Sequence, residues 1–236
     1  MNDKPTQDEL IHEFKRKYDS LYPRIKHNFE PQHDTLVVSM CGAKKNPISM
    51  KQKIYARDMY LGPGNTLLRK NIPTLPVDWV ILSGGYGSMW QTSYIRYYDD
   101  VIMDISKAKL RDMGDYLRYH RDLKRLIKRG NYRRIIFTIS DRWINTINLK
   151  ELGELAGDKC ELIVFLSHER LRDKKFLHPQ NMINIDIPHT YLPLFGAPLT
   201  AIKEKITISY LKYINENPEI GITDYINDRV KKLKNF

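Results

Sequence analysis

The 236-residue sequence has few of the features that mark membrane, disulfide-stabilised or metal-binding proteins. No stretch approaches the ~20 apolar residues that a membrane-spanning helix requires, so we expect no membrane segment. Only two cysteines occur, Cys41 and Cys160, which gives neither a disulfide framework nor a CxxC pair for zinc. The polar N-terminus also argues against a secretory signal. We therefore expect a cytoplasmic protein without a metal site or a cofactor.

Acidic residues are in the minority, since 39 Lys and Arg residues accompany 28 Asp and Glu residues and give a formal net charge of +11. The surplus is concentrated between positions 118 and 134, where eight basic residues accompany one acid, Asp122. Such a surplus is typical of proteins that bind polyanions, although a solvated helix face is the simpler alternative. The candidate nucleic-acid-binding residues are Arg118, Arg121, Lys124, Arg125, Lys128 and Arg129.

Hydrophobic patterning predicts an α/β fold with three layers, α/β/α, around a mainly parallel central sheet of four or five strands. The strands are expected at 35–40, 79–83, 134–140, 161–166 and 182–185. A capping box at Thr6 to Glu9 predicts an N-terminal helix. Further helices are expected at 50–60, 104–129, 146–156, 198–215 and 223–233. We expect an N-terminal helix and connector over 1–34, a core domain over 35–215 and a helical tail over 216–236.

The residues that follow each strand are the candidate site, because ligands bind outside the carboxyl ends of parallel strands. After the first strand, Gly42 lies in a small-residue loop with Lys44 and Lys45, which can hold a phosphate through backbone N–H groups and ammonium charge. The Walker A spacing is absent, and a tight turn with solvated lysines is the alternative. Cys41 suits a thiolate nucleophile or, more simply, a small buried residue.

Glycines and aromatic residues follow the second strand. The candidate ligand-binding residues there are Ser83, Gly85, Tyr86, Gly87 and Trp90. The glycines permit close approach of a ligand, and Tyr86 and Trp90 offer ring faces for a base, although an ordinary turn also uses glycine. Tyr98 and Asp99 come next along the chain. Asp99 is the candidate general acid or base, with a helix-capping aspartate as the alternative.

Polar clusters also follow the third and fourth strands. Ser140, Arg142 and Trp143 place a hydroxyl, a guanidinium and an indole within four residues, and Arg142 can fork onto a phosphate. Asp141 is equally suited to be the salt-bridge partner of Arg142. His168 follows the fourth strand, but it lacks further ligands at metal spacing, so we interpret it as a polar loop residue with catalytic potential.

Four segments, taken in order, resemble a family of small bacterial, archaeal and phage α/β proteins. The motifs of that family are C-S-x-x-K, A-x-x-[LM]-Y-x-G, I-L-S-A-x-Y-G-L and P-Y-D. The matching residues here are Cys41 with Lys45, Ala56–Gly62, Ile81–Gly87 and Tyr98–Asp99. The first loop is also similar to that of the uracil-DNA-glycosylase-like domain of archaeosine synthase, and more distantly to DNA-associated peroxide-stress proteins. These resemblances imply a three-layer α/β fold and contact with nucleic acid or its bases.

We therefore expect an enzyme that acts on a nucleobase or an N-glycosidic bond in DNA, tRNA or a nucleotide. Asp99, Cys41 and Lys45 are the candidate catalytic residues, and a base in duplex would have to be flipped into the site. The alternatives are a non-catalytic DNA- or RNA-binding protein that uses the basic segment, and a nucleotide hydrolase or transferase. The expected partner is nucleic acid or a nucleotide, and a homodimer is left open.

Overall fold

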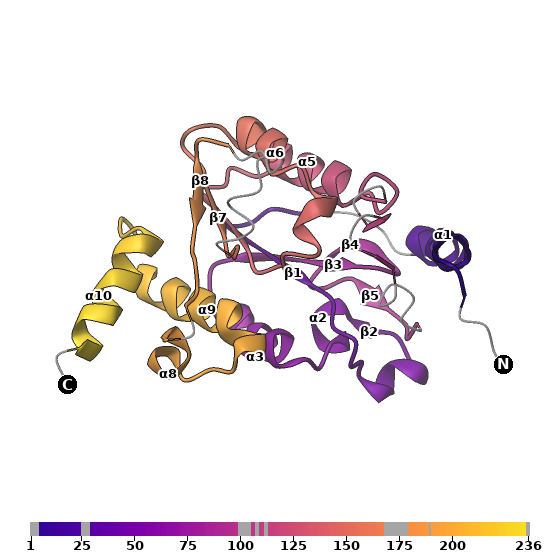
Figure 1. Cartoon of the computed structure of the whole chain (residues 1–236), viewed down its shortest axis with the longest axis horizontal. Helices are drawn as coiled ribbons and strands as arrows, with labels where there is room; N and C mark the ends of the chain where they lie inside the picture. The colour runs from indigo at the N-terminus through magenta and orange to yellow at the C-terminus, as the bar shows by residue number, and fades with distance from the viewer. Residues whose placement is uncertain are drawn as a thin grey trace.

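The computed structural model describes residues 5–24, 29–98, 105–106, 109–110, 113–167, 179–188 and 190–234. A central sheet lies between two groups of helices (Figure 1). Helices α5 (Tyr119–Arg129) and α6 (Leu149–Ala156) cover one face, and α3 (Pro63–Asn71) and α9 (Ile202–Ile214) cover the other. The other helices among the described residues are α1 (Gln7–Leu21), α2 (Ala56–Met59), α8 (Tyr191–Phe195) and α10 (Ile222–Lys234).

The main sheet has six strands in the described part of the chain, in the order β4–β3–β1–β6–β7–β8. Their bounds are Thr35–Met40 for β1, Asp78–Ser83 for β3, Gly87–Trp90 for β4, Arg134–Phe137 for β6, Glu161–Val164 for β7 and Met182–Asn184 for β8. All neighbours pair in parallel except β4, which is antiparallel to β3. A separate pair joins β2 (Ile54–Tyr55) and β5 (Tyr94–Ile95).

The five predicted strands are all present, but the predicted count of four or five was too low. The segment Gly87–Trp90, interpreted as part of a glycine-rich loop, pairs with β3 as an edge strand. Gly87 has a φ of 73°, a left-handed conformation that favours glycine, and it begins this strand directly after the turn. The missed strand therefore arises from a tight reversal after β3.

Both faces of β1 are buried, which explains its continuous apolar sequence. Leu36 and Val38 belong to the core cluster that includes the buried residues of α5 and α6, whereas Val37 belongs to the cluster beneath α3 and α9. Alternate residues of a strand point to opposite faces, so a sheet covered on both sides requires apolar residues at every position.

Three of the predicted helices differ from the observed ones. The helix expected over 104–129 is interrupted: Lys109 and Leu110 are helical, 113–118 form turns, and α5 begins at Tyr119 because Arg118, with a φ of 57°, breaks a right-handed helix. Residues 104, 107–108 and 111–112 lie outside the described part of the chain. The helix expected over 50–60 is replaced by a short turn, β2 and the four-residue α2. The helix expected from 198 begins at Ile202. The capping box at Thr6 is confirmed. Within the described residues, no helix combines the length and the apolar character needed to cross a membrane.

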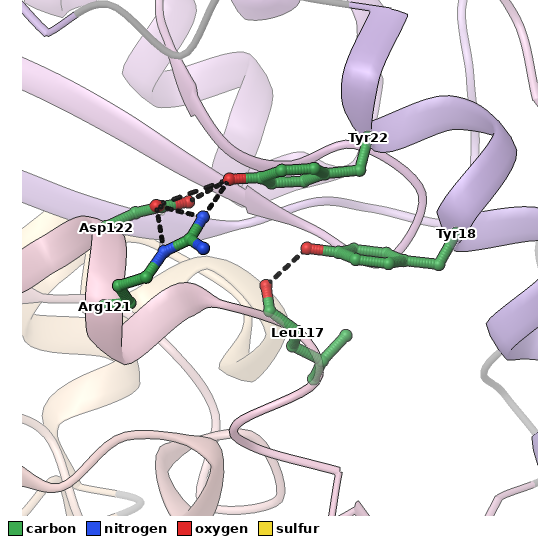
Figure 2. A network of polar contacts seen from close by, with 5 residues as sticks. All are labelled: Tyr18, Tyr22, Leu117, Arg121 and Asp122. Carbon is green, nitrogen blue, oxygen red and sulfur yellow. Dashed lines mark hydrogen bonds and ion pairs between the residues drawn. The ribbon is translucent and has the colours of Figure 1, made fainter.

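Helix α1 is attached to the start of α5, on the face of the sheet that α5 and α6 cover. The contact is made by two stacked tyrosines, Tyr18 and Tyr22. Figure 2 shows the contacts: the Tyr18 hydroxyl donates to the Leu117 carbonyl at 2.7 Å, and the Tyr22 hydroxyl donates to the Asp122 carboxylate at 3.2 Å. Arg121 pairs with the same carboxylate at 3.2 Å and donates to the Tyr22 oxygen at 2.6 Å. The Asp122 side chain is fully buried, so its charge is compensated within this network. Helix α1 and the turn that follows it therefore pack against the core through Tyr18 and Tyr22.

Candidate functional site

The strand order of the sheet reverses between β1 and β6. After β1 the chain forms β3 on one side, and it returns later to form β6 on the other side of β1. At such a reversal the connecting helices lie on opposite faces, which leaves a crevice at the carboxyl ends of the two central strands. Here α3 follows β1 on one face and α6 follows β6 on the other. Ligands of open α/β sheets bind in this crevice.

A cavity of about 370 Å³, which we call the switch-point cavity, lies at this reversal. Its walls come from the carboxyl ends of β1 and β6 and from the first residues of α3 and α9. Its polar lining side chains include Cys41, Asn65, Thr138, Ser140, Lys203 and Glu204. Trp143 also lines the wall. The volume falls within the range of pockets that bind small molecules.

Glu204, in the first turn of α9, brings a carboxyl group into this cavity. The carboxyl packs against Gly64 of α3 so closely that a Cβ atom at position 64 would lie 2.5 Å from its carbon and 2.7–2.8 Å from its oxygens. Burial raises the pKa of the Glu204 carboxyl to about 7, and smaller opposing effects come from its own backbone N–H, the Lys203 charge and the Thr138 hydroxyl. The group can therefore exchange a proton near neutral pH.

Two further polar atoms of the lining have unmet hydrogen-bonding capacity. Thr138 is 5% exposed, and its hydroxyl faces the Glu204 carboxyl without making a hydrogen bond of ordinary length to any described residue. The side-chain oxygen of Asn65 also has no hydrogen-bond partner among the described residues, and it is buried although the residue is partly exposed. Buried polar atoms of native proteins are nearly always paired, so these two atoms are suited to meet the polar edge of a ligand.

Lys203 joins α9 to the ends of two strands. Its ammonium group donates to the carbonyl oxygens of Phe165 at 2.6 Å and Ile139 at 3.1 Å, and it lies 3.7 Å from the Asp141 carboxylate. Desolvation lowers the pKa of Lys203, and the Asp141 charge opposes that effect. The lysine also lines a second cavity of about 270 Å³ with Asp141, Ser167 and Asp186, at the ends of β6, β7 and β8. Lys203 thus forms part of the wall between the two cavities.

The described residues contain no group of three His, Cys, Asp or Glu side chains that could hold a metal ion. No protein-family model, curated protein or solved structure matches the chain.

Residues from four of the motif segments meet beside the cavity in a buried hydroxyl cluster. The Tyr98 hydroxyl lies 2.9 Å from that of Tyr60 and 2.8 Å from that of Ser83. The Lys45 ammonium lies 4.5 Å from the centre of the Tyr98 ring. Burial raises the pKa of Tyr60 and Tyr98, and the neighbouring Cys41 raises it further. Segments that are distant in the sequence are thus brought together at the end of β1.

The predicted aromatic platforms are placed differently. Trp143 lines the switch-point cavity, but Tyr86 is 3% exposed and its hydroxyl donates to the Arg96 carbonyl at 3.3 Å, so its ring presents no open face. Trp90 lies on β4 and packs edge-on against Phe29. Ser83 accepts hydrogen bonds from the backbone N–H groups of Gly85 and Tyr86 and so holds the turn before Gly87.

The predicted phosphate ligands also differ in position. Gly42 and Ser140 line the switch-point cavity, whereas Lys44 is solvent-exposed. Arg142 donates to the Ile105 carbonyl at 2.5 Å. The predicted residues Asp99 and His168 lie outside the described residues.

The predicted basic surface on α5 is only partly open. Arg121 is held in the network of Figure 2, and Lys124 pairs with Glu151. Arg118 lies with its guanidinium 4.6 Å from the centre of the Tyr22 ring. The exposed cations of this helix that remain are Arg125, Lys128 and Arg129.

Sequence reasoning missed Glu204, Lys203 and Asn65. All three lie at the starts of helices, where charged and amide side chains are common. Their residue types alone therefore do not indicate a binding site. A signal is present in the two glycines that flank Pro63. One of them, Gly64, makes the space for the Glu204 carboxyl.

Proposed function

We propose that this protein is an enzyme that acts on a nucleobase or on the N-glycosidic bond of a nucleotide, DNA or RNA, with the reacting nucleoside in the switch-point cavity. The observation that carries this proposal is the position of a cavity, lined by Trp143 and by a proton-exchanging carboxyl, at the reversal of the strand order. A three-layer α/β/α architecture supports it, because crevices of this kind in such sheets bind nucleotides.

The chemistry of the lining supports a nucleoside as the ligand. Trp143 provides a flat apolar surface, and stacking of a base on an aromatic side chain contributes about 1–3 kcal/mol. Asn65 and Thr138 offer one amide and one hydroxyl to the polar edge of a base or sugar. An apolar wall with a few polar groups is the usual composition of a small-molecule site.

Replacing the indole tests this function. We expect Trp143→Leu, which removes the stacking surface but stays apolar, to reduce kcat/KM for base release about 10- to 100-fold. Release of free base from nucleosides, single-stranded DNA, duplex DNA and tRNA is measured by chromatography. Tyr94→Leu is the matched control, since Tyr94 is an exposed aromatic residue that lines neither cavity. If the wild-type protein releases no base from any of these substrates, the proposal is wrong.

The second candidate function is binding of a polynucleotide by α5. Arg125, Lys128 and Arg129 are exposed on the half of α5 that leads to the amino end of β6. The switch-point cavity lies beyond the carboxyl end of β6, so these cations and the cavity are at opposite edges of the sheet. A polynucleotide held along α5 would therefore use a surface separate from the cavity.

Charge reversal distinguishes the two surfaces. We expect the triple variant Arg125→Glu, Lys128→Glu, Arg129→Glu to weaken polynucleotide binding at least tenfold and to flatten its salt dependence, because about three phosphate contacts are lost. Base release from free nucleosides should be unchanged. Arg121 is left intact, since its loss would also disturb α1. Equal affinity of the variant and the wild-type protein at every salt concentration would exclude α5 as a binding surface.

A further inference from the structure

The switch-point cavity contains one acidic side chain among its described lining residues, and that side chain is Glu204. No described residue forms an ion pair with it, because the neighbouring Lys203 directs its ammonium group to Ile139, Phe165 and Asp141 instead. A buried carboxyl without a cationic partner is unusual, since ionised groups in protein interiors are normally paired.

Where α3 packs against α9, the Glu204 carboxyl occupies the space beside Gly64. Gly64 has no side chain, and even a methyl group there would overlap the carboxyl. Gly64 is the second residue of α3, and its φ is not positive, so the backbone there does not require glycine. Helix formation therefore does not explain the glycine, whereas room for the Glu204 carboxyl does.

The other titratable and charged groups around Glu204 are few. Lys203 precedes it on α9, Cys41 lies at the end of β1, and Asp141 lies beyond Lys203 after β6. Helix α3 contributes no charged side chain to the cavity, only the amide of Asn65. The Thr138 hydroxyl is buried in the same wall and faces the Glu204 carboxyl, whose pKa it lowers. The cavity thus contains a proton carrier with a buried hydroxyl beside it.

We infer that Glu204 is the catalytic residue that transfers protons during cleavage of the N-glycosidic bond of a nucleoside in the switch-point cavity. This inference rests on the proposed function. It assigns the proton transfer to a residue of α9 that the sequence did not indicate.

The step is a hydrolysis in which Glu204 is regenerated. The oxygen of a water molecule forms a bond to C1′ of the sugar, the bond between C1′ and the base nitrogen breaks, and the electron pair of that bond goes to the base nitrogen. The ionised Glu204 carboxylate accepts a proton from the water and then passes it to the departing base nitrogen. A carboxyl whose pKa lies near 7 is suited to both transfers at neutral pH.

The test compares Glu204→Gln with Asp99→Asn and with the control Glu216→Gln, which changes an exposed glutamate after α9. We expect Glu204→Gln to reduce base release at least about 100-fold while nucleoside affinity changes less than threefold, and Glu216→Gln to be unchanged. The wild-type rate should fall about tenfold per pH unit below pH 7 and be flat above it. A wild-type rate that does not change between pH 5 and 9 overturns the inference even where the variant fails to fold.

The outcomes separate this inference from the proposed function. Wild-type base release that persists in Glu204→Gln overturns the role of Glu204 and leaves the proposed function standing, and loss in Asp99→Asn would then assign the proton transfer to Asp99. No base release by the wild-type protein overturns both. Gly64→Ala is a second variant, because its methyl group displaces the carboxyl without breaking α3, and we expect it to reduce the rate at least tenfold.

Discussion

Lys203→Met is expected to lower the free energy of unfolding by about 3 kcal/mol, because the change removes three interactions at once. Methionine keeps the length and apolar character of the lysine chain, so the loss is confined to the ammonium group. That group donates to the carbonyls of Ile139 and Phe165 and lies beside Asp141. Without it, two carbonyl oxygens at the ends of β6 and β7 lose a charged donor.

Urea unfolding measures this difference, and Lys212→Met is the matched control. Lys212 is an exposed lysine on the same helix, so its replacement should change the free energy of unfolding by less than about 0.5 kcal/mol. Equal midpoints for the two variants would show that Lys203 does not fasten α9 to the sheet. We also expect Lys203→Met to weaken ligand binding in both cavities, since the lysine lines each of them.

Raising the pH from 4.5 to 7 is expected to destabilise the wild-type protein relative to Glu204→Gln by on the order of 3 kcal/mol. The pKa of Glu204 is raised from 4.5 to about 7 in the folded protein, so the folded state retains a proton that the unfolded state has already lost. The stabilisation from this proton is fully present below pH 4.5 and is lost as the pH rises to about 7. Above that pH the difference between the two proteins is constant.

Denaturation of both proteins in parallel between pH 4.5 and 9 tests this expectation. All other titrating groups are common to the two proteins, so subtraction leaves the contribution of Glu204 alone. Parallel curves across the whole range would mean that the Glu204 carboxyl titrates as it does in the unfolded chain. In that case the packing against Gly64 would not restrict its ionisation.

The positions of the buried strands were predictable because the pattern that indicates each strand lies within its own residues. Leu36, Val37 and Val38 are apolar without alternation, which is the pattern of a strand covered on both faces. The edge strand Gly87–Trp90 lacks that pattern, because it is short and begins with glycine and serine. The interruption at Arg118 was not predictable either, since the left-handed backbone of a single arginine leaves the apolar spacing unchanged.

The candidate site was predictable in its location and less so in its residues. Parallel strands bring their carboxyl ends to one edge, which is why Cys41, Gly42, Ser140 and Trp143 line the same cavity. Glu204 joins them only through the packing of α9 on α3, and no spacing rule links residues so distant in the chain. Likewise, Tyr86 and Trp90 have the composition of a base platform but are used as packing residues.

The contact between Gly64 and Glu204 also has a consequence for the evolution of this chain. The backbone at position 64 does not require glycine, and the nearest obstacle to a larger residue there is the carboxyl on the neighbouring helix. Descendants of the same ancestor that keep the glutamate should keep the glycine. Lineages that have lost the glutamate are free to acquire a larger residue at position 64, so the two positions should be inherited as a pair.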